Sequence, residues 1–142
     1  MSLGAALAID HGTVKTGFAV CDALRISVQP LTTVRADGHG DELLGYIADL
    51  MAEREIRTFV LGLPLNMDGS EGPRAADVRR FAERLCARFP NVELAWIDER
   101  LTTVEADERL RKAGYHWKQA KPLRDSWSAV VLLEDWLTSL SG

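Results

Sequence analysis

Three carboxylates of this 142-residue sequence stand where a divalent metal ion could bind: Asp10, Glu99 and Asp125. Asp10 ends one apolar run, Glu99 follows another, and Asp125 precedes the apolar stripe of the last helix. Clustered carboxylates repel one another, and a hard divalent cation bound through oxygen is the usual compensation. Mg²⁺ or Mn²⁺ held there could activate a water and stabilise the leaving oxygen of a phosphodiester. The acids therefore predict metal-dependent phosphodiester hydrolysis, provided that the fold gathers them.

Each acid also has an ordinary structural interpretation. Asp10 could begin a turn, and Asp125 could be the N-cap of the last helix. Asp98 and Glu99 precede Arg100 and could form a surface ion pair that contributes little to stability. Because successive strand side chains point to opposite faces, one of Asp98 and Glu99 faces the predicted site and the other points away, and periodicity does not choose between them.

The other residue types suited to metal or redox chemistry indicate no second site. The three histidines lack metal-ligand spacing and are expected to be surface or turn residues: His11, His39 and His116. Cys21 and Cys86 lie in apolar surroundings and are expected to be small buried hydrophobes, not a disulfide or metal pair. The tryptophans are mostly core by position, except that Trp117 could stack on a base.

Composition is that of a soluble globular chain, with 46% hydrophobic and 27% charged residues, and we expect one domain over residues 1–142. The longest wholly apolar run, residues 129–133, is far too short for a membrane span, and no basic residue precedes the first apolar run. A cytoplasmic protein without a membrane partner is therefore expected. The net charge of -4 argues against loose adhesion to nucleic acid, yet it allows a local basic surface.

The elements that must position the acids can be read from hydrophobic periodicity and turn residues. Strands are expected over residues 5–10, 16–22, 27–34, 57–63 and 92–97, with an irregular point at Pro30. Helices are expected from Asp41, Pro73 and Thr102 and from near Asp125. This order predicts an α/β fold in which a mixed sheet of about five strands carries helices on both faces, with ligands at the carboxyl ends of the parallel strands.

Four segments resemble, in order and spacing, the YqgF family of ribonuclease H-like proteins, also called RuvX or Holliday junction resolvases. They are IDHGTVKTGFAV, VLGLPLNMDGSEGPRAADVRRFAERL, DERLTTVEA and KPLRDSWSAVVLLEDWL, which together cover nearly the whole chain. The resemblance implies a ribonuclease H-like fold, a divalent-metal nuclease site and a cytoplasmic role in maturing the 5′ end of pre-16S ribosomal RNA.

The resemblance also assigns roles to individual positions. Asp10 matches the acid of the first strand, Glu99 the second acid and Asp125 the acid of the last helix. Further contacts to nucleic acid are expected at family motif positions and nearby basic residues, namely Lys15, Asn66, Arg100, Thr102, Lys118, Lys121 and Arg124. Compared with RuvC-type resolvases, Ser128 replaces a fourth acid, so the metal site is one ligand poorer and needs substrate phosphate to complete it.

The sequence is also compatible with other substrates and other functions. The substrate could be structured RNA or branched DNA, and cutting a four-way junction symmetrically would require a twofold dimer, whereas a monomer or weak homodimer suits RNA processing. The DHGTVKTG segment could instead be the phosphate loop of an actin-like or sugar-kinase-like ATPase. A non-catalytic binding module is the third possibility. The basic segment 115–124 is predicted to be a loop that closes over substrate.

Overall fold

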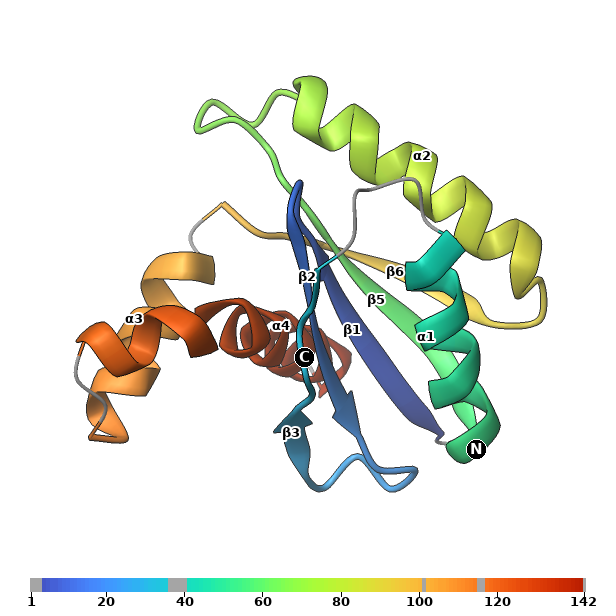
Figure 1. The fold of residues 1–142 in the computed structure, drawn as a ribbon, viewed down its shortest axis with the longest axis horizontal. Coiled ribbons are helices and arrows are strands. Elements are labelled where there is room, and N and C mark those ends of the chain that lie inside the picture. The colour runs from blue at the N-terminus through green and yellow to red at the C-terminus, as the bar shows by residue number, and fades with distance from the viewer. Residues whose placement is uncertain (1–3, 36–40, 101, 115–116, 142) are drawn as a thin grey trace.

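The computed structural model describes residues 4–35, 41–100, 102–114 and 117–141, and for 102–103, 117–126 and 141 it describes the backbone alone. Its elements are shown in Figure 1. In chain order they are β1 (Ala5–His11), β2 (Lys15–Cys21), β3 (Val28–Pro30), β4 (Val34–Arg35), α1 (Asp41–Glu53), β5 (Ile56–Leu63), α2 (Pro73–Arg88), β6 (Glu93–Asp98), α3 (Thr102–Lys112) and α4 (Trp117–Ser141).

One mixed sheet organises these elements. β1 and β2 form the predicted antiparallel hairpin, and the strand order is β3-β2-β1-β5-β6, with β4 also pairing with β2. β1 pairs with β5 in parallel, and β5 pairs with β6 in parallel. The connection from β1 to β5 contains α1, and the connection from β5 to β6 contains α2, so both are crossover helices. The carboxyl ends of β1, β5 and β6 therefore lie at one edge of the sheet.

The expected third strand, residues 27–34, is two short strands instead of one, so the sheet contains six strands among the residues that the structure describes. Pro30 ends β3, because a proline has no amide with which to continue the ladder. Leu31 still donates its amide to the carbonyl of Phe18, and pairing with β2 resumes at Val34.

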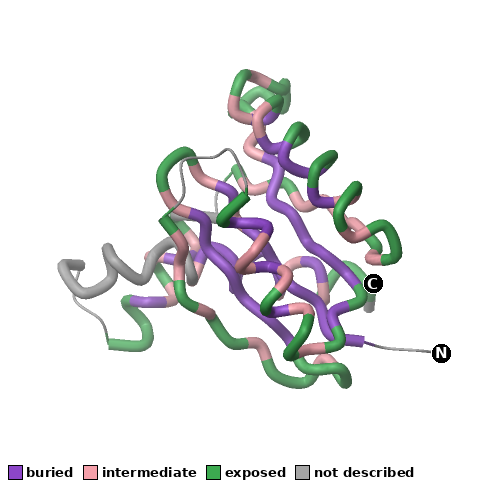
Figure 2. The backbone as a smooth tube through the Cα atoms, turned by 45° about the vertical axis from the view of Figure 1, so that its right-hand side comes forward, coloured by how far each residue is buried: buried purple, intermediate pink, exposed green. Residues whose placement is uncertain are grey.

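The two faces of the sheet are packed differently. One face buries large side chains such as Leu7, Ile9 and Phe59 against α1 and α2, each contributing about 1.5–3 kcal/mol to stability. The other face presents Ala6 and Ala8 to α4. These small residues let the helix backbone approach the sheet closely, and Figure 2 shows buried residues running along the central strands. The helices thus cover both faces, as predicted.

Helix α4 begins earlier than expected, at Trp117 and not near Asp125. The backbone of residues 117–124, which the sequence assigned to a loop, is therefore helical. Residue 125 lies about two turns inside the helix, so the N-cap interpretation of Asp125 is wrong. Sequence patterns missed this start because the segment is polar, contains Pro122 and has no apolar stripe.

The other helix ends agree with their sequence signals. Pro73 occupies the first turn of α2, where its missing amide is not needed, and α3 spans the expected residues. Gly114 adopts φ +94°, a left-handed conformation that suits glycine after a helix. No helix in the described part of the chain has the length and apolar character needed to cross a membrane.

Candidate active site

Two of the three predicted acids meet at the carboxyl edge of the sheet. Asp10 lies near the end of β1, and Glu99 directly follows β6. Side chains two residues apart along a strand point to the same face of the sheet. Ala8 and Ile97, which lie two residues before the two acids, both pack on the α4 face. Asp10 and Glu99 therefore also point toward α4. The two carboxyl groups are in hydrogen-bonding contact.

The positive charge near the acid pair is too small to keep both carboxyls ionised. Burial, the charge of Asp10 and the hydrogen bond between the two carboxyls together raise the pKa of Glu99 to about 9, with burial the largest cause. The Arg74 guanidinium opposes this shift and Asp98 adds to it. Glu99 is therefore protonated at neutral pH unless another cation joins the pair.

Gly62 on β5 makes room for the Glu99 side chain. A Cβ at position 62 would stand 2.3 Å from Glu99 Oε2 and 2.9 Å from Leu132 Cδ1 of α4. The bare glycine therefore lets the carboxyl cross β5 and lie between the sheet and α4. Gly62 was not among the predicted site residues, although a glycine inside an otherwise apolar strand is a known signal of close approach.

The donor set fits a hard divalent cation, because both groups offer carboxylate oxygens in a cradle that a side chain at residue 62 would fill. Among the side chains that the structure describes, no group of three histidine, cysteine or acidic residues could hold a metal ion. The third predicted acid, Asp125, has its side chain outside the described residues.

Asp98 points away from the pair, and the structure thus settles which of the two neighbouring acids faces Asp10. Arg100 Nη2 lies 2.7 Å from Asp98 Oδ2, and this hydrogen-bonded pair lowers the pKa of Asp98. Arg100 also donates from Nη1 to the Met67 carbonyl at 3.3 Å. The arginine expected to contact phosphate thus joins the β6 end to the loop after β5.

That loop is ordered by its own side chains. Asn66 donates from Nδ2 to Ser70 Oγ at 2.9 Å, and Asp68 Oδ1 accepts from the amide and the hydroxyl of Ser70. The Asn66 side chain is exposed. Its described contacts nevertheless organise the turn.

The remaining predicted contact residues are placed less fully. Lys15 is half-buried at the start of β2, and its carbonyl accepts the Gly12 amide at 3.0 Å in the hairpin turn. The side chains of the others lie outside the described residues, namely Thr102, Lys118, Lys121 and Arg124.

His11 is buried, contrary to the expectation of a surface or turn residue. Its ring stacks on Phe81 of α2 with centroids 4.5 Å apart, and neither ring nitrogen has a hydrogen-bond partner among the described residues. Burial, followed by the nearby charge of Arg74, lowers the pKa of His11 to about 4, which keeps the ring neutral. Sequence spacing could not show this, because Phe81 is remote in the chain. The other two histidines lie outside the described residues.

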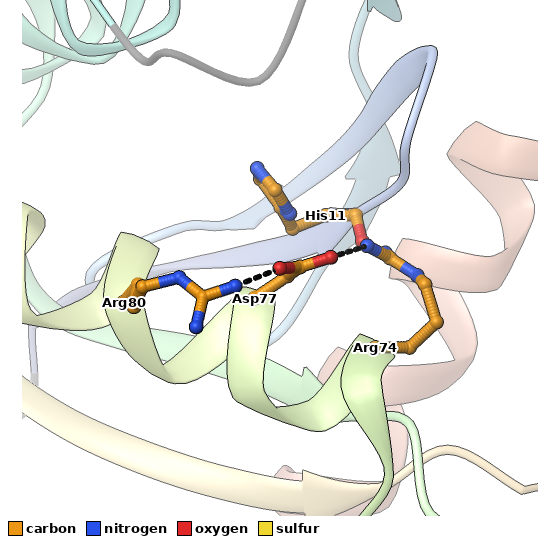
Figure 3. Close-up of polar contacts among 4 residues, drawn as sticks. All are labelled: His11, Arg74, Asp77 and Arg80. Atoms are coloured by element: carbon orange, nitrogen blue, oxygen red, sulfur yellow. Dashed lines mark hydrogen bonds and ion pairs between the residues drawn. The ribbon is translucent and has the colours of Figure 1, made fainter.

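Arg74 is a second residue near the site that sequence analysis missed. From the first turn of α2 it donates Nη2 to the backbone carbonyl of His11 at 2.6 Å (Figure 3). Its charge also reaches Glu99. A single arginine in an arginine-rich helix carries no distinguishing sequence signal, so only the fold reveals this position.

The mixed sheet and the helices that cover its two faces form a ribonuclease H-like fold. The structure resembles the fowlpox virus resolvase solved with substrate Holliday junction DNA, with TM-score 0.59, 10% identity and coverage of 96% of this chain and 98% of that chain. It also resembles Thermus thermophilus RuvC in complex with a Holliday junction substrate, with TM-score 0.54, 12% identity and coverage of 88% and 91%. At such low identity the likeness shows the fold.

Sequence comparison places the chain within that class. Residues 4–139 match the family described as "RuvX: Holliday junction resolvase", and the chain belongs to this family. A relative from Dechloromonas aromatica is 37% identical over 137 residues, covering 96% of this chain and 92% of its own length, and is named "Putative pre-16S rRNA nuclease". A relative of the same name from Sodalis glossinidius is 43% identical over 135 residues, with 94% of both chains covered.

Proposed function

We propose that this protein is a nuclease that uses Mg²⁺ or Mn²⁺ to hydrolyse phosphodiesters in structured nucleic acid. The observation that carries the proposal is the contact between Asp10 and Glu99 in the cradle over Gly62. Two carboxyls forced together at a partly open sheet edge raise the free energy of the folded state when both are charged. A bound divalent cation offsets that cost.

Asp10 and Glu99 would hold the cation, and Asp125 of α4 would add the third carboxylate. Support for Asp125 comes from the helix period, because residues 125, 129 and 132 fall on one face and Ala129 and Leu132 are buried against the sheet. When bound, the cation supplies an activated water and stabilisation of the leaving oxygen. Glu99 must release its proton for binding, so we expect metal affinity to rise with pH.

Around the acids, other residues would bind the nucleic acid. Arg100 and Asn66 lie on the loop side of the edge, and Lys15 lies at the hairpin beside Asp10. The remaining proposed contacts come from the starts of α3 and α4, namely Thr102, Lys118, Lys121 and Arg124. These contacts would position the substrate strand and would not read its sequence.

The substrate we favour is the 5′ end of pre-16S ribosomal RNA, in the cytoplasm, and the support is the name shared by the relatives. A four-way DNA junction is the second candidate, supported by the family description and by the fold of RuvC. A junction resolvase needs a twofold dimer, whereas a monomer or weak homodimer suits RNA processing. Sedimentation of the purified protein with each substrate therefore separates the two.

The test of the nuclease is a cleavage assay with purified wild type and Asp10→Asn, each with Mg²⁺, Mn²⁺ or neither. We expect the substitution to lower the rate more than about 100-fold, since even the outer partners of metal ligands contribute 10–100-fold. Isothermal titration should show weakened metal binding by the variant. Equal cleavage by the two proteins would remove Asp10 from the mechanism.

A further inference from the structure

Positive charge is concentrated on α2, although the chain as a whole has a net charge of -4. This 16-residue helix, PRAADVRRFAERLCAR, contains five arginines against one aspartate and one glutamate. Its charge is therefore opposite in sign to that of the whole chain. A segregated basic surface of this kind is the electrostatic footprint of a polyanion-binding protein.

Most of this charge lies on one flank of the helix. On this flank, charged residues follow one another at intervals of three or four residues and so lie along one line of the helix, namely Asp77, Arg80, Arg84 and Arg88. The side of the helix that faces the sheet buries Val78, Phe81 and Leu85. Arg80 and Arg84 have side chains that are 68% and 45% exposed. We call Arg74, Arg80, Arg84 and Arg88 the α2 arginine row; it extends for about 21 Å at 1.5 Å per residue.

The fifth arginine has a different environment. Arg79 donates from Nε to Glu71 at 2.6 Å, and its guanidinium carbon lies 5.0 Å from the centroid of the Trp96 ring of β6. It is thus committed to partners on the other flank of α2. This makes Arg79 a matched control for the row.

The N-terminal end of the row lies beside the C-terminal end of β1, which carries Asp10 of the acid pair. Arg74 donates to the carbonyl of His11, the residue after Asp10, and its charge lowers the pKa of Glu99. Asp77 lies between Arg74 and Arg80, as Figure 3 shows. Its Oδ2 is 3.4 Å from Arg74 Nη1, and its Oδ1 accepts from Arg80 Nη2. One carboxylate is therefore shared by two guanidinium groups at the end of the row nearest the site.

We propose that the α2 arginine row binds successive phosphates of a nucleic-acid strand that leads to the acid pair, and that Asp77 occupies the place of one phosphate in the free protein. Arginine suits this role because its planar fork binds phosphate oxygens in pairs. The existing ion pairs are exposed and weak, so a phosphate can displace Asp77 and Asp41 from Arg80 and Arg84 at little cost. This proposal rests on the proposed nuclease function only for the cleavage of the bound nucleic acid at the acid pair.

Binding is measured separately from cleavage, with Ca²⁺ in place of Mg²⁺ and Mn²⁺. The probes are a fluorescent stem-loop RNA with a single-stranded extension and a fluorescent four-way DNA junction. The variants are Arg80→Gln, Arg84→Gln and the double substitution, with Arg79→Gln as the control on the same helix. Arg57→Gln is a second control, because Arg57 is exposed at the start of β5, at the opposite edge of the sheet from the acids.

We expect each row substitution to make the slope of log affinity against log salt shallower by about 0.7–0.9, which is the value of one lost phosphate contact. The double variant should lose about twice as much, and both controls should keep the wild-type slope. The probe whose binding depends on the row identifies RNA or DNA as its ligand. A double variant with the wild-type slope on both probes would overturn the proposal.

Asp77→Asn gives a signature that a purely structural row would not produce. Removing the competing charge while keeping the side-chain shape should tighten binding and steepen the salt slope. Were Asp77 only a helix-stabilising partner of Arg80, the variant would melt earlier and bind no better, which would contradict the proposal. Cleavage is then assayed with Mg²⁺. If binding depends on the row but no cleavage occurs, the nuclease proposal fails and the proposal for the row stands. If cleavage occurs and binding does not depend on the row, the proposal for the row fails and the nuclease proposal stands.

Discussion

The last two residues of β1, Asp10 and His11, are neighbours in sequence and belong to opposite faces of the sheet. On the α4 face, Asp10 meets Glu99, and the pKa of Glu99 rises to about 9. On the α2 face, His11 stacks on Phe81, and its pKa falls to about 4. Burial favours the neutral form in both cases. The difference is that the acid pair has oxygen ligands at a site that a cation can complete, whereas the imidazole is enclosed against an aromatic ring.

The largest expected effect comes from Glu99→Gln compared with Asp98→Asn. Glutamine removes the charge that would bind metal, so cleavage should fall by more than about 100-fold. Asp98 is exposed and paired with Arg100, so its asparagine variant should keep cleavage and lose less than about 1 kcal/mol of stability. Rates on one substrate and chemical denaturation of both variants check this; comparable loss of cleavage in the two would break the distinction between the faces.

Glu99→Gln should also change the pH dependence of stability. The folded-state pKa of Glu99 lies above its ordinary value of 4.5, so its protonated form stabilises the metal-free fold at low pH, and that stability is lost as pH rises from about 4.5 toward about 9. The variant should lack this loss and be the more stable protein at pH 8 without metal. Adding Mn²⁺ should raise the melting temperature of wild type alone.

Gly62→Ala should give the next largest effect. The added Cβ would meet Glu99 Oε2 and Leu132 Cδ1, so the carboxyl must move away from Asp10 and α4 must shift. We expect strongly reduced cleavage and a stability loss of about 1–3 kcal/mol from overpacking. The control is Gly45→Ala in α1, where a Cβ would meet no atom within 4 Å apart from the backbone of its own helix and where alanine should stabilise the helix by about 0.5–1 kcal/mol. Wild-type cleavage by Gly62→Ala would show that the cradle is dispensable.

The smallest effect on activity is expected for His11→Phe, because the ring is enclosed on the face opposite the acids. Its effect on stability should have the opposite pH dependence to that of Glu99. The lowered pKa of His11 means that the unfolded chain binds more protons, so stability present above pH 6.5 is lost as pH falls toward about 4. The variant should avoid up to about 3 kcal/mol of that loss. Denaturation at pH 7 and pH 4 measures the difference, and equal acid sensitivity would contradict a neutral buried His11.

Local signals were sufficient for most of the fold. Apolar runs of strand length predicted β1, β2, β5 and β6 to within about a residue or two, and Pro73 and Gly114 marked helix ends. The errors lie where local signals are absent or ambiguous. The polar first turns of α4 carry no apolar stripe, and Pro30 gave only a hint that the third strand would divide.

The site was only partly predictable, because the face of the sheet to which a side chain points depends on the strand register. Trp96 and Ile97 are both apolar, so alternation could not show that Ile97, and with it Glu99, turns toward α4. Arg74, Gly62 and the burial of His11 depend on contacts between remote segments. The role of Asp125 stays a prediction, since its side chain lies outside the described residues.

The division of the outer strand into β3 and β4 affects how copies of the protein can associate. A continuous strand edge offers a row of amides and carbonyls to which a strand of another molecule can add. At this edge the fragments are three and two residues long, and Pro30 has no amide to donate. Sheet extension between molecules is therefore disfavoured at this edge, and we expect any twofold assembly to use a different surface.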